Sequence, residues 1–279
     1  MRAFSGVVAA ALLSAVAGCR SLWPTVPPPV ATVLAPAHEG ESGTVDAAVH
    51  LESAPAPATA PARPSHDARH QPDARGPVVC IDPGHPSETS GGAAANGVVE
   101  RQVNQAVADS LQGLLEARGF RVVLTKHGVD ERVTNRRRAE IANECGAAVF
   151  LRLHCDASHA PGFTLYYPDR AVALGGVTGP SAGLRAASRR IAEELHAALA
   201  SRLTRLRDRG VLGESRTAVG ARQGALTGSV HSRVPVVLIE MADLESPSDA
   251  KLIGSAEGRS YVASALANAL CEVLRPSGS

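Results

Sequence analysis

The stretch Val78-Val79-Cys80-Ile81-Asp82-Pro83-Gly84-His85 sets the pattern of the chain beyond residue 76. Its first four residues form a short, unbroken apolar run, and the Asp-Pro-Gly that follows favours a turn, which together indicate a buried strand. A helix is then predicted over 101–118, because its apolar residues share one face and Gly119 is a good stop signal. A buried strand followed by a helix is the first unit of a parallel α/β sheet.

The same alternation of strands and helices continues to the end of the chain. Further strands are predicted over 121–125, 147–153, 163–167 and 236–239, and further helices over 131–145, 181–206 and 257–274. We therefore predict an α/β fold with a single, mostly parallel, twisted sheet of about six strands and helices on both faces. The segment 209–234 contains five glycines and is expected to be a long, loose connection that walls a substrate groove.

Composition separates two parts of the chain. Of its 19 prolines, ten fall between positions 20 and 76, where no apolar period survives, so this part is predicted to be a disordered linker. The 203 residues that follow, 77–279, are long enough for one hydrophobic core. The balance of 28 basic and 27 acidic residues argues against a nucleic-acid partner.

The first residues are predicted to be a targeting signal. Arg2 precedes the apolar run 3–17, which is too short to span a membrane and ends in Val16-Ala17-Gly18-Cys19. This ending resembles the bacterial lipobox, so we predict a signal peptide over 1–18, lipidation of Cys19 and a linker over 19–76. Arg rather than Asp at position 20 favours the outer membrane. The alternative is an ordinary cleaved signal that happens to be followed by a cysteine.

Four polar residues stand at the ends of predicted elements. His85 follows the first strand, Glu100 opens the first helix, and His154 and Glu240 end two later strands. Since parallel sheets place their sites at the carboxyl ends of strands, we expect these side chains to converge. Two histidines and one glutamate form a known catalytic zinc set, and a second glutamate can act as a base on water. Taken singly, each histidine could be a structural polar residue, and Glu100 could complement its helix dipole.

Residues 78–274 resemble the zinc-dependent N-acetylmuramoyl-L-alanine amidases of the amidase 3 family. The resemblance covers essentially the whole domain, in matching order and spacing. It is carried by Ile81 to His85, Asn96 to Glu100 with Val103-Asn104, Leu115 to Gly119, Arg136 to Asn143, Leu153-His154, Gly162-Phe163 with Tyr166-Tyr167, Pro235 to Met241 and Ser246 to Leu252.

This resemblance implies specific roles for the four polar residues. His85, Glu100 and His154 would bind one Zn²⁺ ion, and Glu240 would be catalytic. The implied reaction is hydrolysis of the amide between N-acetylmuramic acid and L-alanine in peptidoglycan, which releases stem peptides. We accordingly expect a monomeric, lipid-anchored protein of the bacterial cell envelope that works in the periplasm. Whether an activator protein is needed is left open.

Two departures from the family pattern keep alternatives open. Pro86-Ser87-Glu88 stands where the family has a glycine pair, and Cys155 stands where it has alanine. A catalytically inactive amidase fold that binds peptidoglycan or regulates another hydrolase is the main alternative, and a zinc hydrolase of another wall amide is a closer one. A Cys155–His154 hydrolase is disfavoured, because neighbours along a strand point to opposite faces.

Weaker expectations concern residues around this site. Glu88, Arg216 and Arg222 are predicted to contact substrate, the arginines through peptide carboxylates. For either arginine taken singly, a place on a solvated surface loop is the alternative. The cluster formed by Arg132, Arg136, Arg137 and Arg138 is predicted to be a solvated helix face that makes ion pairs. Cysteines 80, 145, 155 and 271 fall in predicted core elements, where free cysteine packs as a small apolar side chain, so we predict mostly free thiols.

Overall fold

The computed structural model describes residues 76–274. The predicted signal peptide, Cys19 and all but the last residue of the predicted linker lie outside the described residues. None of the helices within 76–274 combines the length and the apolar character needed to cross a membrane.

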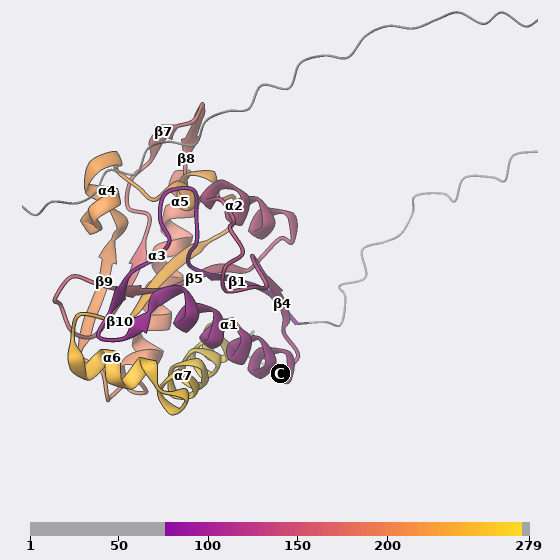
Figure 1. Ribbon diagram of the computed structural model, residues 1–279. Coiled ribbons are helices and arrows are strands. Elements are labelled where there is room, and N and C mark those ends of the chain that lie inside the picture. Colours follow the sequence, from indigo (N-terminus) through magenta and orange to yellow (C-terminus); the bar gives the residue numbers. More distant parts are fainter. Residues whose placement is uncertain (1–75, 275–279) are drawn as a thin grey trace, which may run out of the picture. The chain divides into compact units, whose positions relative to one another are not determined.

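A six-stranded sheet forms the centre of the fold (Figure 1). Its strands lie in the order β4 (Arg121–Leu124), β1 (Val78–Pro83), β5 (Val149–Asp156), β10 (Val236–Asp243), β6 (Phe163–Tyr167) and β9 (Asp208–Gly213). Neighbouring strands are parallel except β10 and β6, which are antiparallel. The predicted mostly parallel α/β sheet is therefore confirmed.

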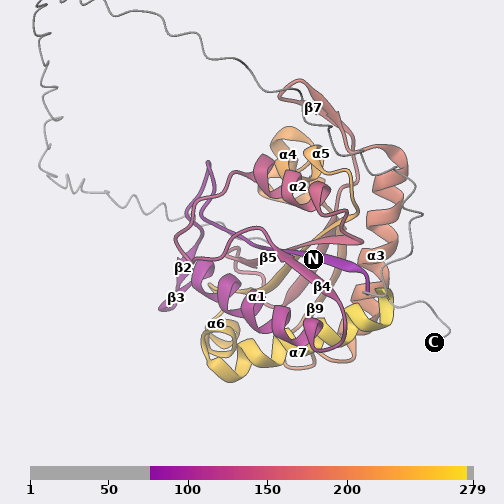
Figure 2. The same cartoon turned by 90° about the vertical axis from the view of Figure 1, so that its right-hand side faces the viewer.

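Helices cover both faces of this sheet (Figures 1 and 2). On one face, α7 (Ala256–Leu274) packs between α1 (Glu100–Glu116) and α3 (Ala182–Ala200). On the other, α2 (Asn135–Glu144) lies against β1 and α5 (Thr227–His231) lies against α2. The short α6 (Pro247–Gly254) connects β10 to α7. Two small hairpins, β2–β3 (Ala94–Ala95, Val98–Val99) and β7–β8 (Val172–Leu174, Val177–Gly179), were not predicted.

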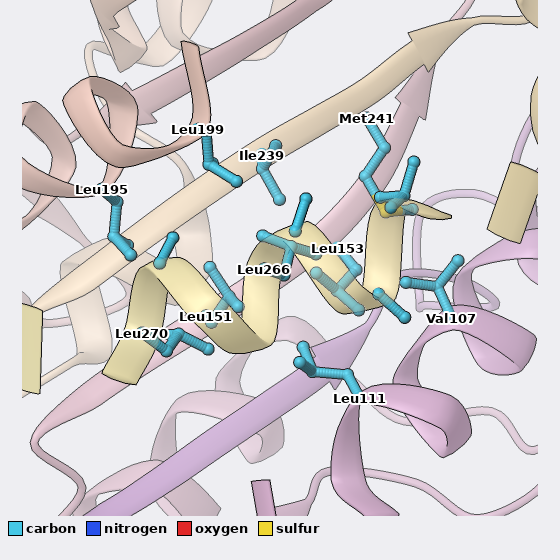
Figure 3. Packing of buried hydrophobic residues seen from close by; sticks show 14 of the residues in the cluster. Val107, Leu111, Leu151, Leu153, Leu195, Leu199, Ile239, Met241, Leu266 and Leu270 are labelled. Atoms are coloured by element: carbon cyan, nitrogen blue, oxygen red, sulfur yellow. The ribbon is translucent and has the colours of Figure 1, made fainter. Parts of the chain in front are cut away.

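The larger core lies between the sheet and the face formed by α1, α3 and α7. Figure 3 shows Leu266 and Leu270 of α7 beside Leu151, Leu153 and Ile239 of the sheet, all of them fully buried. Alternate residues of the same strands point to the other face, where a smaller cluster joins Cys80, Ala139, Ala142, Ala147, Phe150 and Val236. The side chains at 82, 152, 154 and 240 therefore emerge on the face that α2 and α5 cover.

Several element boundaries differ from the prediction. The helix predicted from 131 begins at Asn135, because the hydroxyl of Thr134 accepts a hydrogen bond from the N–H of Arg137 and caps it. The helix predicted to reach 206 ends at Ala200, although Leu203 and Leu206 stay buried in the turns that follow. The structure contains Cys80, Cys145, Cys155 and Cys271 as free thiols.

The segment predicted as a loose connection over 209–234 is the largest difference. It contains most of β9, a 3-10 turn η1 (Glu214–Arg216), α4 (Ala218–Gln223) and α5. Residues 208–213 have weak strand preference because two of the six are glycine, but pairing with β6 satisfies the backbone groups on one side of this edge strand.

Candidate metal centre and active site

The structure brings His85, Glu100 and His154 together. One donor atom from each lies within 4.8 Å of the other two. Oε1 of Glu100 is 3.1 Å from Nδ1 of His154 and 3.4 Å from Nε2 of His85. The three residues come from the loop after β1, the first turn of α1 and the end of β5, so the carboxyl edge of the sheet positions them as predicted.

Backbone groups fix the orientation of Glu100 and His85. The N–H of Ala93 donates to Oε2 of Glu100 at 2.8 Å, and the N–H of Cys155 donates to Oε1 at 3.2 Å. Nδ1 of His85 lies 3.3 Å from the carbonyl oxygen of Ser90. Such outer contacts hold a metal-binding side chain in one rotamer and tautomer.

Glycine at position 84 is required by the close approach of His154. A Cβ atom on Gly84 would lie 2.3 Å from Cε1 of the His154 ring. The Asp-Pro-Gly turn therefore does more than reverse the chain, because it leaves room for the second imidazole.

The charge state of the cluster suits a metal ion. Although burial alone would raise the pKa of Glu100, hydrogen bonds with His154 and His85 lower it below its ordinary value. Burial lowers the pKa of His154, which favours the neutral, ligating imidazole. Nε2 of His154 and Oε2 of Glu240 are buried without a hydrogen-bond partner. Orphaned polar atoms are costly, so two imidazoles, one carboxylate and these orphans fit a divalent ion of the zinc type.

Glu240 lies beside this cluster. It is opposite His154 in the register of β10 and β5. His85, His154 and Glu240 line one cavity of about 720 Å³. Burial, together with the carboxylates of Glu100 and Asp156, raises the pKa of Glu240 well above its ordinary value. A carboxylate with a raised pKa is a stronger proton acceptor.

A buried ion-pair network supports the loop that carries His85. Asp82 accepts hydrogen bonds from Arg138 at 2.5 Å, Arg152 at 2.8 Å and Thr125 at 2.5 Å. Arg138 also donates to the carbonyl oxygens of Pro83 and Pro86, at 2.8 and 2.9 Å. The network therefore ties both sides of the turn at Gly84 to α2.

The prediction of a solvated arginine cluster is therefore wrong for Arg138. Arg136 and Arg137 do make ion pairs with Glu140 and Glu144 at the surface, as predicted. Arg138 is buried instead, because the carboxylate of Asp82 and three carbonyl oxygens satisfy its guanidinium.

Of the three residues predicted to contact substrate, two line the cavity and one does not. Arg216 and Arg222 line the cavity. Glu88 is not among the residues lining it; its carboxylate accepts from the backbone N–H of Asn135 at 2.8 Å and so holds the start of α2. Cys155 packs into the larger core, away from the cavity that His154 lines, as strand alternation predicts.

Comparison with known proteins agrees with this geometry. Residues 79–272 match the amidase 3 family, described as N-acetylmuramoyl-L-alanine amidase. The chain belongs to this family. The predicted enzyme family is confirmed.

Curated relatives of the amidase domain carry the same description. It is 30% identical to the N-acetylmuramoyl-L-alanine amidase LytC of Bacillus subtilis over 194 residues, which cover 68% of this chain and 34% of that protein. It is 26% identical to the N-acetylmuramoyl-L-alanine amidase AmiC of Neisseria meningitidis, with 73% of this chain and 54% of that protein covered. The chain thus spans about a third of the length of LytC and about half of the length of AmiC.

Solved structures support the fold of the amidase domain. The amidase AmiC2 of Nostoc punctiforme is similar with a TM-score of 0.57 and 22% identity, over 70% of this chain and 96% of that chain. The amidase Ami1 of Mycobacterium abscessus is similar with a TM-score of 0.59 and 21% identity, over 72% and 100% of the two chains.

Proposed function

We propose that the protein is a zinc-dependent amidase that hydrolyses the bond between N-acetylmuramic acid and L-alanine in peptidoglycan and releases stem peptides. The observation that carries the proposal is the position of Glu240 in one cavity with His85 and His154, beside the buried carboxylate of Glu100. Membership of the amidase family supports the same bond as the target.

His85, Glu100 and His154 are the residues that would hold one zinc ion. Zinc bound there supplies Lewis-acid chemistry, because it polarises a carbonyl and lowers the pKa of water. The protein contributes the preorganised donors, since Glu100 is fixed by the N–H groups of Ala93 and Cys155 before any ligand arrives.

Glu240 would move the proton in this reaction. Its carboxylate would accept a proton from the attacking water and pass it to the nitrogen of the departing L-alanine. Burial supports this role, because it raises the pKa of Glu240 and so strengthens its hold on the proton in transit. No second carboxylate is needed for the transfer, since one group serves as base and then as acid.

For the whole protein we propose a monomer anchored in the bacterial cell envelope. The lipobox-like ending at Cys19 supports lipidation, and Arg at position 20 supports retention at the outer membrane with the amidase domain in the periplasm. Metabolic labelling with a fatty acid tests this: the wild-type chain should incorporate label and Cys19→Ala should not. Label retained in Cys19→Ala contradicts the anchor.

Digestion of intact peptidoglycan tests the activity. The purified protein is incubated with and without a chelator, and the products are identified by mass spectrometry. Free stem peptides that disappear with the chelator support the proposal. Glu240→Gln should keep its zinc content and lose about 10²- to 10⁴-fold in rate, whereas Arg233→Gln, outside the cavity, should match wild type. Binding of peptidoglycan without cleavage would establish the inactive alternative instead.

A further inference from the structure

The cavity at the active site is rich in arginine. Five arginines and only two carboxylates, Asp156 and Glu240, line it; the arginines are Arg138, Arg152, Arg209, Arg216 and Arg222. Such an excess of cationic side chains attracts an anionic ligand into a partly enclosed space.

Three of these arginines already have partners inside the protein. Arg138 and Arg152 share the buried carboxylate of Asp82. Arg209 donates to Asp156 at 3.1 Å and to a backbone carbonyl oxygen. Within the part of the chain that the structure describes, the guanidinium groups of Arg216 and Arg222 have neither a hydrogen bond nor an ion pair. These two charges are therefore available to a ligand.

The segment that carries Arg216 and Arg222 is nevertheless fixed. Buried Glu214 accepts hydrogen bonds from the N–H of Leu226 at 2.9 Å and the hydroxyl of Ser229 at 2.5 Å. The hydroxyl of Thr217 caps α4 by accepting from the N–H of Gly220 at 2.9 Å. A Cβ on Gly220 would lie 1.8 Å from the carbonyl oxygen of Glu214, so the turn before α4 is tightly closed. Two unpartnered arginines on a fixed segment are preorganised for binding.

The proposed substrate has a carboxylate near the bond to be cut. In peptidoglycan the residue after L-alanine is D-glutamate joined through its side chain, so its α-carboxylate is free unless the wall is amidated there. Glu240, Arg216 and Arg222 line the same cavity of about 720 Å³. One residue spans about 3.8 Å, so a stem peptide cut beside Glu240 would place this carboxylate within that cavity. Arginine is suited to it, because its planar guanidinium donates paired hydrogen bonds to a carboxylate.

We propose that Arg216 and Arg222 bind the free α-carboxylate of the second stem-peptide residue and make the enzyme selective for stems that are not amidated at that position. This inference rests on the proposed amidase activity. Carboxylates further along the stem could bind arginine in the same way. The test therefore compares substrates that differ at the second residue with substrates that differ at the third.

The test compares matched soluble muramoyl tripeptides with the full protein. One pair differs only in whether the α-carboxyl of the second residue is free or amidated, and a second pair differs only at the carboxyl of the third residue. We expect wild-type kcat/KM to be at least about tenfold higher for the free form of the first pair, and about equal within the second pair. In Arg216→Gln, Arg222→Gln and the double variant, the first ratio should fall toward one.

Arg233→Gln is the matched control. Arg233 is exposed and lies outside this cavity, so its substitution should keep the wild-type ratio. A wild-type ratio of one for the first pair, or a ratio that the double variant retains, overturns the carboxylate assignment while the amidase activity stands. Selectivity seen only within the second pair would mean that the arginines bind the carboxylate of the third residue, which also overturns the proposal. If no tripeptide and no intact peptidoglycan is cleaved, the proposed function itself fails and the inference falls with it.

Discussion

Nη1 of Arg138 lies 2.5 Å from Oδ1 of Asp82, and the two side chains are 1% and 0% exposed. This buried pair joins α2 to the end of β1, directly before the turn that carries His85. Burial alone would raise the pKa of Asp82, but Arg138 and Arg152 lower it well below its ordinary value, so the carboxylate is charged in the folded protein. The charge is tolerated only because its partners are present.

Removing one partner should destabilise the fold. We expect Arg138→Met to lower the free energy of unfolding by about 3–5 kcal/mol, because it leaves a buried carboxylate with one cation fewer. Denaturation with urea measures the loss. Arg137→Met is the control, since its ion pair with Glu144 is at the surface, and its denaturation midpoint should stay near that of wild type. Equal midpoints for the two variants would contradict a supporting role for the Asp82 network.

Gly84→Ala should weaken metal binding through contact with a single ring. The new methyl group would lie 2.3 Å from Cε1 of His154 and so displace the imidazole from Glu100. We expect zinc affinity to fall about 10- to 100-fold, as for other changes that disturb ligand orientation. Competition with a fluorescent chelator measures it. Gly91→Ala, where a methyl group meets nothing within 4 Å, should retain wild-type affinity; a loss there as well would point to general disturbance of the loop.

Glu214 should make stability depend on pH. Burial raises its pKa from 4.5 to about 7, so the unfolded chain loses this proton at lower pH than the folded protein does. The protonated Glu214 side chain therefore contributes its full share to the free energy of unfolding below pH 4.5. This contribution, about 3 kcal/mol, is lost as the pH rises through 7. In Glu214→Gln the free energy of unfolding should fall less between pH 5 and pH 8 than it does in the wild type. Urea denaturation at the two pH values measures this difference. An unchanged slope in the variant would mean that Glu214 is already ionised at pH 5.

The cysteines should differ in reactivity. A hydrogen bond with Cys80 lowers the pKa of Cys145 to about 7, and Cys145 is partly exposed, whereas Cys80 and Cys155 are buried. In the native protein a thiol reagent should therefore modify Cys145 before the two buried thiols, and all should react after denaturation. Peptide mass spectrometry over time gives the order. Early modification of Cys155 would contradict its place in the core.

The convergence of the four polar residues could be predicted from sequence because a parallel sheet gathers the ends of its strands at one edge. His85, Glu100, His154 and Glu240 needed only correct strand assignments to be placed together. The structure extends β5 and β10 beyond the predicted ends, so His154 and Glu240 lie within strands, but on the predicted edge.

The supporting residues could not be predicted in the same way. Arg136, Arg137 and Arg138 are adjacent and chemically alike, and only the position of Asp82, 56 residues earlier, decides which of them turns inward. β9 and α4 were missed for a related reason. Their stability comes from pairing with β6 and from the buried carboxylate of Glu214, which residue preferences within 208–223 do not show.

Along β5, side chains that face the cavity alternate with side chains that face the larger core, and this alternation affects which strand pairing is stable. Cys155 belongs to the larger core, while His154, one residue earlier, faces the cavity and Glu100. A pairing error of one residue between β5 and its neighbours would exchange every such position, so that an imidazole and a guanidinium would enter the apolar layer and leucines would face water. The polar residues to which we assign the reaction thus also penalise the nearest misfolded pairing, and replacing them with apolar residues would reduce the difference in free energy between the correct sheet and the sheet shifted by one residue.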